Sequence, residues 1–282
     1  FRRVLFRSRR HAGNGLDVEG LATFRATSEG MVEQVADRVH TTEAALRIDV
    51  VALFPETITA ALAASIPARA IERGLATLVA HDLRTWGLGK HRAVDDAPYG
   101  GGAGMLLRPE PLVAAIEALR TEESTVILLD AGGERLRQER ARDLATRRHL
   151  IILCGRYEGV DDRVRGYVDL ELSLGDFVLS GGEPAAIALC DAILRLVPGS
   201  IDTASLDEES FSTPELLEYP QYTRPPDFRG TRVPEILVSG NHGAVAAWRK
   251  AAAERRSAAK SAGTSPRPDL GLDGAQEADG ER

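Results

Sequence analysis

The feature that most constrains the fold is a series of short apolar runs separated by stretches with helical spacing. The runs are "RIDVVALF" before Pro55, "LATLVAHDL" at 75–83, "TVILLD" at 125–130 and "LIILCG" at 150–155. The stretches near 56–73, 109–120 and 138–148 are predicted helices. Buried strands that alternate with helices are typical of an α/β fold, so we expect a mostly parallel sheet covered by helices.

The rest of the chain divides by composition. "PAAIALCDAILRLVPG" (184–199) is a predicted helix on the sheet, with proline near its start and Pro-Gly at its end. Residues 200–215 are polar and acidic, as in a flexible linker, and 216–262 form a predicted smaller helical domain with "GAVAAWRKAAAERR" as its clearest helix. Residues 263–282 are expected to be a tail, and residues 1–45, which lack a regular period, are expected to be a non-native or disordered extension.

The charge balance bears on nucleic-acid binding. With 35 Lys and Arg against 42 Asp and Glu, the net charge of −7 argues against binding over the whole surface but allows a local basic patch. Candidate residues of such a basic patch are Arg224, Arg229, Arg232, Arg249, Lys250, Arg255 and Arg256, with Tyr219 and Tyr222 beside them and Lys90, His91 and Arg92 earlier in the chain. His242, in the same region, is interpreted as a turn or helix-start residue and not as part of the patch.

The sequence also bears on where the protein is located in the cell. No apolar run reaches the roughly 18 to 20 residues of a membrane helix, and no secretory leader is recognisable, so we expect a cytoplasmic protein without membrane contact. Cys154 and Cys190 lie in apolar runs and are expected to be reduced core thiols.

Three glycine-rich loops are candidates for chemistry: "VDDAPYGGGAGM" (94–105), "CGRYEGVDDRV" (154–164) and "SLGDFVLSGGEP" (173–184). The last contains Asp176 and Glu183 but no lysine or arginine, which disfavours a phosphate ligand and favours one with positive charge. Its apolar residues could form a slot for adenine. S-adenosylmethionine meets these conditions, while a nucleoside or amino-acid site stays open.

Five motifs occur in one order along the chain, between residues 91 and 249, and the resemblance that they carry runs from about residue 46 to 256. They are "HRAVDDAPYGGGAGM", "CGRYEGVDDRV", "SLGDFVLSGGEPAAIALCDAILRLVPG", "YPQYTRP" and "VPEILVSGNHGAVAAWR". Together they resemble the bacterial tRNA (guanine-N1)-methyltransferase family, usually called TrmD.

The resemblance implies more than the patterns do. It implies the SPOUT fold, an α/β sheet (46–199) with a deep trefoil knot that holds S-adenosylmethionine, and a homodimer with active sites at the subunit interface. It also implies methylation of N1 of the guanine 3′ of the anticodon in tRNA when another guanine precedes it, which maintains the reading frame. Magnesium is an expectation from the resemblance.

The resemblance also assigns site residues. Where relatives often have Ser-Pro-Gln-Gly, this chain has "LLDAGGERL", so side-chain contacts from Asp130 and Ala131 are open, and Phe177 replaces a tyrosine found in many relatives. The expected cofactor residues are Leu128, Leu129, Gly155, Tyr157, Glu158, Leu174, Gly175, Phe177, Leu179, Gly181 and Gly182.

Catalytic roles are expected for three residues in and before the linker. Arg195 occupies the position of a catalytic arginine, where it would stabilise charge on guanine O6. Glu209 replaces the aspartate that relatives place before "SF" and is the expected general base, supplied by the partner chain. Asp207 is the alternative base if the loop shifts register, and Glu208 should point elsewhere.

Two other functions stay open at this point. The chain could be a catalytically weakened tRNA-binding protein of the same fold, or a nucleoside-binding metabolic enzyme that does not bind RNA. Methyl incorporation would separate the first from an active enzyme, and salt-dependent tRNA binding would separate the second from both.

Overall fold

The structure, a computed structural model, describes residues 46–202, 205–206 and 208–264. The predicted extension of residues 1–45, the alternative base Asp207 and residues 265–282 of the predicted tail lie outside the described residues.

A five-stranded parallel sheet in the order β2-β1-β6-β5-β7 forms the centre of the fold. Every residue of β6 is buried, as expected of a central strand that is covered on both faces. The predicted α/β class is therefore confirmed. The strands are β1 (Leu46–Ala52), β2 (Ala76–Asp82), β5 (Ser124–Arg135), β6 (His149–Cys154) and β7 (Leu170–Ser173).

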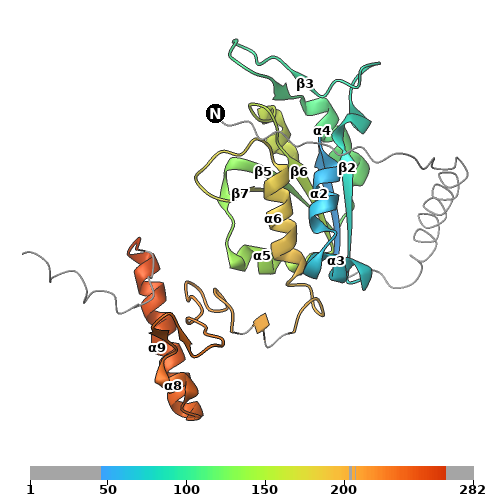
Figure 1. Ribbon diagram of the computed structural model, residues 1–282. Coiled ribbons are helices and arrows are strands. Elements are labelled where there is room, and N and C mark those ends of the chain that lie inside the picture. The colour runs from blue at the N-terminus through green and yellow to red at the C-terminus, as the bar shows by residue number, and fades with distance from the viewer. Residues whose placement is uncertain (1–45, 203–204, 207, 265–282) are drawn as a thin grey trace, which may run out of the picture. The chain divides into compact units, whose positions relative to one another are not determined.

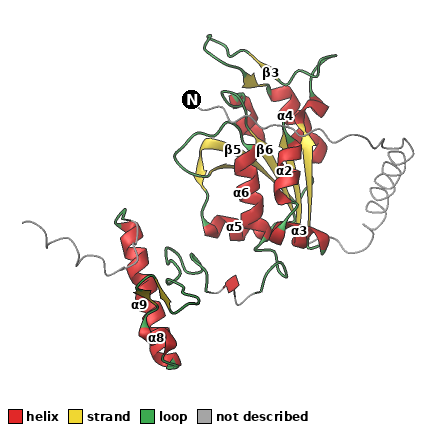
Figure 2. Cartoon of the chain, in the orientation of Figure 1, coloured by secondary structure: helices red, strands yellow, loops and turns green. Residues whose placement is uncertain are grey.

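Helices cover both faces of this sheet (Figure 1, Figure 2). The first face buries one apolar cluster under α2 (Pro55–Leu62), α3 (Ser65–Glu72), α5 (Gln138–Ala145) and α6 (Glu183–Leu194). The second face buries another cluster under α4 (Pro109–Leu119) and the short 3₁₀ helices η1 (Leu83–Trp86) and η2 (Asp162–Tyr167).

The predicted helical stretch near 56–73 is two helices. The helix α2 ends at Leu62 and α3 begins at Ser65, whose φ is +60°. Pro67 lies in the first turn of α3, where its missing N–H costs no hydrogen bond. A continuous helix would place the same proline in its interior, so the chain breaks before it.

The C-terminal end of α6 also differs from the prediction. The helix packs on the sheet through Ala186, Leu189 and Ile193 as expected, but it ends at Leu194 rather than near residue 199. Pro198 has no N–H to donate to the Leu194 carbonyl four residues earlier, and Val197 before it avoids helical geometry, so the helix cannot continue through this segment. As a result Arg195 is the C-cap residue of α6.

The strand predicted at 125–130 is longer and interrupted. Its pairing with β7 breaks between Leu129 and Glu134 and then resumes to Arg135. At Gly133 a Cβ atom would lie 2.6 Å from the Leu172 nitrogen, so the returning strand fits only with glycine there. The partner strand β7 was not predicted, because "LELS" is short and half polar.

One carboxylate is fully buried in the sheet. Asp49 of β1 contacts Nε2 of His81 at 2.6 Å, Nε2 of His149 at 2.7 Å and Nε of Arg47 at 2.6 Å. Burial by itself raises the pKa of Asp49, but the hydrogen bonds from these three residues outweigh it and lower the pKa below its ordinary value.

The C-terminal part contains short elements and one long helix. The predicted helix is confirmed and extends further, as α9. The Asn241 side chain caps it by accepting from the Ala244 N–H at 3.1 Å, and His242 is its first residue, as interpreted from the sequence. The elements are the hairpin β8 (Asp227–Phe228) and β9 (Thr231–Arg232), α8 (Glu235–Val238) and α9 (His242–Ser261). A second hairpin, β3 (Asp95–Asp96) and β4 (Leu106–Leu107), frames the first glycine-rich loop.

The structure also bears on the two cysteines and on the expected lack of a membrane helix. Cys154 and Cys190 are free and buried, as predicted. Among the described residues, no helix has the length and apolar character needed to span a membrane.

Candidate functional site

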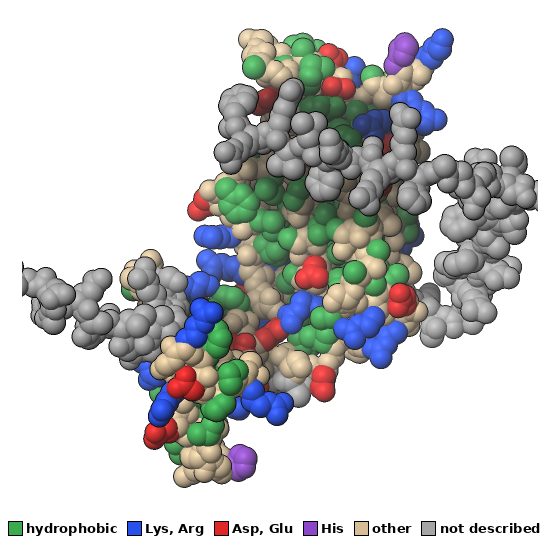
Figure 3. Space-filling view, viewed as in Figure 1, with side chains coloured by type: hydrophobic (Ala, Val, Ile, Leu, Met, Phe, Trp, Pro, Cys, Tyr) green, Lys and Arg blue, Asp and Glu red, His purple; other side chains and the backbone are tan. Residues whose placement is uncertain are grey.

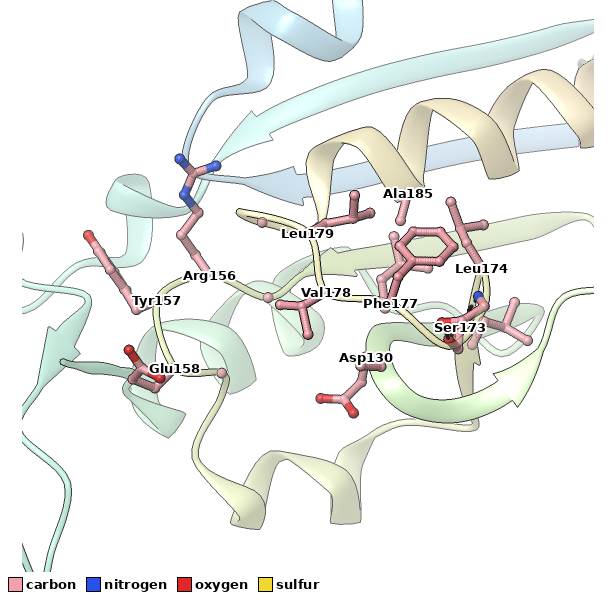
Figure 4. Close-up of a pocket in the computed structure, with 18 residues that line it drawn as sticks. Asp130, Arg156, Tyr157, Glu158, Ser173, Leu174, Phe177, Val178, Leu179 and Ala185 are labelled. Carbon is pink, nitrogen blue, oxygen red and sulfur yellow. Dashed lines mark hydrogen bonds between the residues drawn. The ribbon is translucent and has the colours of Figure 1, made fainter. Parts of the chain in front are cut away.

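A cavity of about 180 Å³ lies beside the break in β5 and the ends of β6 and β7 (Figure 4). Parallel strands present the loops at their carboxyl ends to one edge of the sheet, which is where such folds bind ligands. The lining residues are Leu129, Asp130, Ala131, Gly155, Arg156, Tyr157, Glu158, Gly159, Leu172, Ser173, Leu174, Gly175, Phe177, Val178, Leu179, Gly181, Gly182 and Ala185.

All of the predicted cofactor residues except Leu128 line this cavity. Leu128 is fully buried in the cluster on the second face of the sheet, whereas Leu129 belongs to the first face. Successive residues of a strand point to opposite faces, so the two leucines cannot both face the cavity.

Close backbone contact joins two of the three glycine-rich loops. The Gly182 N–H donates to the Gly155 carbonyl at 2.7 Å, and Arg156 forms an isolated β-bridge with Gly181. A Cβ atom on Gly182 would lie 2.6 Å from Cα of Cys154. The glycine at 182 is therefore required by the approach of the two loops.

The acids of the third loop have different environments. Glu183 is 4% exposed and its Oε2 accepts from Nη1 of Arg156 at 3.1 Å, while Asp176 is exposed. Arg156 also stacks over the Phe54 ring at 4.6 Å. The expectation that Glu183 offers negative charge to a ligand is wrong, because Arg156 balances that charge within the protein.

The first glycine-rich loop meets the cavity at Glu158. The Glu158 N–H donates to the Met105 carbonyl at 3.0 Å, and a Cβ atom on Gly104 would lie 2.4 Å from Cγ of Glu158. Tyr99 at the tip of this loop is 99% exposed. The three loops that the sequence singled out thus lie together.

The predicted catalytic residues Arg195 and Glu209 contact each other away from the cavity. Nη1 and Nη2 of Arg195 donate to Oε1 and Oε2 of Glu209 at 3.0 and 2.5 Å, and Nε2 of Gln138 reaches Oε1 at 3.3 Å. The hydrogen bonds that Arg195 donates to Glu209 raise the pKa of Arg195 above its usual value. Glu208 has a different partner, because its Oε2 accepts from the Tyr219 hydroxyl at 2.9 Å.

The predicted basic residues of the C-terminal part are only partly free. Arg249 stacks over the Tyr219 ring at 4.7 Å, Arg256 donates to the Glu218 carbonyl at 2.6 Å, and Arg232 pairs with Asp227 at 3.2 Å. Figure 3 shows Lys and Arg side chains interspersed with Asp and Glu on the face in view. Lys90, His91 and Arg92 are exposed in the loop before β3.

Some lining residues were not predicted as site residues. Asp130 and Ala131 come at the end of a predicted strand, and Arg156 lies between the predicted residues Gly155 and Tyr157. These neighbours in the sequence could have identified all three as lining residues. Ser173 begins the third glycine-rich loop and Ala185 lies in the predicted helix after it, but neither was named as a site residue. Leu172 gave no signal because β7 was not expected.

The described residues do not favour a protein-bound metal. Within 46–202, 205–206 and 208–264, no group of three or more His, Cys, Asp or Glu side chains is arranged to hold an ion. The expected magnesium dependence has no ligand set in this part of the chain.

Comparison with known proteins agrees with the resemblance seen in the motifs. The family model described as tRNA (Guanine-1)-methyltransferase TrmD matches residues 46–270. Three relatives carry the name tRNA (guanine-N(1)-)-methyltransferase. The relative from Dictyoglomus turgidum is 47% identical over 226 residues, which cover 80% of this chain and 89% of the relative.

The other two relatives give similar values. The protein from Anaeromyxobacter dehalogenans is 51% identical over 231 residues, covering 80% of this chain and 91% of its own, and that from Chloroflexus aggregans is 50% identical over 229 residues, covering 80% and 87%. On the family match and these identities together, the chain belongs to the tRNA (guanine-1)-methyltransferase TrmD family.

Proposed function

We propose that this protein transfers a methyl group from S-adenosylmethionine to N1 of the guanine 3′ of the anticodon in tRNA, and so maintains the reading frame in the cytoplasm. The observation that carries the proposal is the family match over residues 46–270, within which the predicted cofactor residues other than Leu128 line one cavity.

The lining of the cavity fits the cofactor. Leu174, Phe177 and Leu179 supply apolar surface for adenine, and the glycines at 155, 181 and 182 allow the backbone to approach a ligand closely. Glu158 and Asp176 are exposed carboxylates that suit the positive sulfonium and ammonium groups. Bound here, S-adenosylmethionine supplies an electrophilic methyl group on its sulfonium.

The chain's own residues handle the proton and the charge on guanine. N1 of guanine bears a proton that must leave when the methyl group arrives, and the Glu209 carboxylate accepts it as general base, with Asp207 as the alternative. Arg195 stabilises the negative charge that develops on O6 of the guanine. No step is assigned to magnesium, whose requirement stays an expectation.

The distance between these residues and the cavity supports a homodimer. The helix α6 begins beside the cavity at Glu183 and ends before Arg195, a separation of about 18 Å at 1.5 Å per residue. One chain therefore cannot bring its own Arg195–Glu209 pair to its own cavity without large movement. In a homodimer, Glu209 of one chain could reach the cavity of the other chain without such movement.

The cavity volume supports the same arrangement. About 180 Å³ is below the roughly 300–1,000 Å³ of most small-molecule sites. Phe177, Val178 and Leu179 are 55%, 90% and 40% exposed at its rim, which is apolar surface that a second chain would cover.

We also propose the deep trefoil knot and the domain limits. Gly133 lies close to β7, and Gly182 lies close to Cys154. A knot requires one segment of the chain to pass closely between others, and these glycines permit such close passage beside the cavity. Residues 46–199 would be the SPOUT methyltransferase domain, 200–215 a flexible linker that carries the base, and 216–262 the helical tRNA-binding domain.

Although the net charge of the chain is negative, local groups of Lys and Arg side chains would bind the anticodon stem-loop. The exposed Lys90, His91 and Arg92 and the arginines of the C-terminal part would contact phosphates, which makes tRNA affinity fall steeply with salt.

The experiment that tests the proposal measures label transfer from methyl-labelled S-adenosylmethionine to tRNA transcripts. The transcripts carry guanine or adenine at the target position. Incorporation with guanine only is expected. Salt-sensitive tRNA binding without incorporation would instead favour a binding protein of the same fold, and absence of both would contradict the proposal.

A further inference from the structure

Asp130 is a carboxylate of the cavity lining to which neither the motifs nor the proposed mechanism gives a role. It follows Leu129 at the point where the pairing of β5 with β7 breaks, and its side chain is 25% exposed in the cavity. Figure 4 shows it apart from the apolar side chains of Phe177 and Leu179. A ligand that places an apolar ring against those side chains would have a different group near Asp130.

Two contacts fix this carboxylate. Oδ1 accepts from the Gly132 N–H at 2.8 Å, and Oδ2 lies 3.4 Å from Nη2 of Arg165. Arg165 is itself held by Asp162, whose Oδ1 accepts from its Nε at 2.7 Å, and by Glu171. Asp130 is therefore positioned before any ligand arrives, which lowers the cost of binding.

The environment of Asp130 favours a neutral donor over a cation. A guanidinium group already lies 3.4 Å from Oδ2 of Asp130, although Arg165 shares its charge with Asp162 and Glu171, so a sulfonium or ammonium group at Asp130 would meet a like charge. Both oxygens of Asp130 keep lone pairs that can accept hydrogen bonds. Glu158 and Asp176 differ, because no ion pair with another described residue balances either of them. These two suit the cationic part of a ligand, and Asp130 suits hydroxyl groups.

Ribose hydroxyls are the donors that fit. In other α/β folds a carboxylate after a strand accepts hydrogen bonds from the ribose of a nucleotide bound at the sheet edge. We propose that Asp130 accepts a hydrogen bond from the ribose hydroxyls of the cofactor and makes the site specific for ribose over deoxyribose. The inference rests on the proposed function, since it takes an adenosine-containing cofactor as the occupant.

The test is calorimetric titration of the full chain with S-adenosylhomocysteine and with its 2′-deoxy and 3′-deoxy analogues. The unsubstituted protein is expected to bind at least one deoxy analogue about tenfold more weakly, or worse, as for loss of a hydrogen bond to a charged group. In Asp130→Ala the ribose form should weaken to the level of that analogue, so that the preference disappears.

The matched control is Asp162→Ala. Asp162 holds the same Arg165 but is 92% exposed and does not line the cavity, so this variant should keep the preference for ribose. Asp130→Ser, which keeps a hydroxyl group, is a second variant that serves if circular dichroism shows that Asp130→Ala does not fold.

The outcomes separate the two claims. Suppose that the unsubstituted protein binds S-adenosylhomocysteine, and that Asp130→Ala and Asp130→Ser prefer it over the deoxy analogues as strongly as the unsubstituted protein does. The role of Asp130 is then overturned, and the proposed function stands. If the unsubstituted protein does not bind S-adenosylhomocysteine, both are overturned.

Discussion

Arg195 holds both carboxylate oxygens of Glu209, at 3.0 and 2.5 Å, at the end of α6 that is remote from the cavity. The Glu209 side chain is 16% exposed and that of Arg195 29%, so the pair is partly shielded from water. Two residues that the sequence assigned to one reaction are therefore neighbours within a chain, while the cofactor cavity is not beside them.

Glu209→Gln is predicted to abolish methyl transfer, because the amide cannot take the proton from N1 of guanine. Glu209→Asp should retain activity, with some loss if its carboxylate stops about 1 Å short. Single-turnover methyl transfer measures both. Glu208→Gln is the matched control, since Glu208 contacts Tyr219 instead, and its activity should stay within a few-fold. Normal turnover by Glu209→Gln would move the base assignment to Asp207.

Arg195→Ala is predicted to lower the rate of methyl transfer by about 10²-fold or more, the scale for loss of one group that stabilises a developing oxyanion. Binding of S-adenosylhomocysteine, measured by calorimetry, should be unchanged, because Arg195 does not line the cavity. A wild-type rate in this variant would exclude the proposed role, and a loss of cofactor affinity would show that it acts through the fold instead.

Gly182→Ala is predicted to prevent cofactor binding. Its Cβ atom would lie 2.6 Å from Cα of Cys154, and the loop that lines the cavity would have to shift. The control is Gly166→Ala in η2, where a Cβ atom meets nothing within 4 Å. Calorimetry with S-adenosylhomocysteine should find binding in Gly166→Ala only. Equal affinities would show that the two loops can separate without cost.

Asp49→Asn is predicted to destabilise the protein by about 3 kcal/mol or more, as for removal of one partner from a buried charged cluster. Because the folded-state pKa of Asp49 is lowered, its stabilisation is complete above the ordinary aspartate pKa of about 3.9 and is lost as pH falls through the folded value. Urea unfolding at neutral pH and below about pH 4 measures this. The variant should be less stable at neutral pH, and the gap should narrow on acidification. A gap that stays constant would show that the charge of Asp49 does not matter.

The sequence predicted the central elements because their signals are local. β1 and β6 are short and mostly apolar, and glycine-rich loops after such strands indicated the cavity. What it missed depends on tertiary contacts. β7 is four residues long and half polar, and it is a strand only because β5 pairs with it. Leu128 was assigned to the cavity with Leu129, although a strand can direct only one of two successive side chains there. The pairing of Glu183 with Arg156 joins residues 27 positions apart, which no local pattern reveals.

The central claim is methyl transfer to N1 of guanine at a site that two chains share. It is tested most directly with heterodimers of a Glu209→Gln chain and a Gly182→Ala chain, co-expressed with different tags and purified through both. Such a dimer keeps one intact site, in which the Glu209→Gln chain supplies the cavity and the other supplies Glu209. Formation of 1-methylguanosine in a guanine-bearing transcript should therefore recover to about half of the wild-type rate, as symmetry of the two sites requires, while each homodimeric variant stays inactive. A heterodimer as inactive as its parents would contradict the shared site, and absence of 1-methylguanosine with the wild-type protein would contradict the function itself.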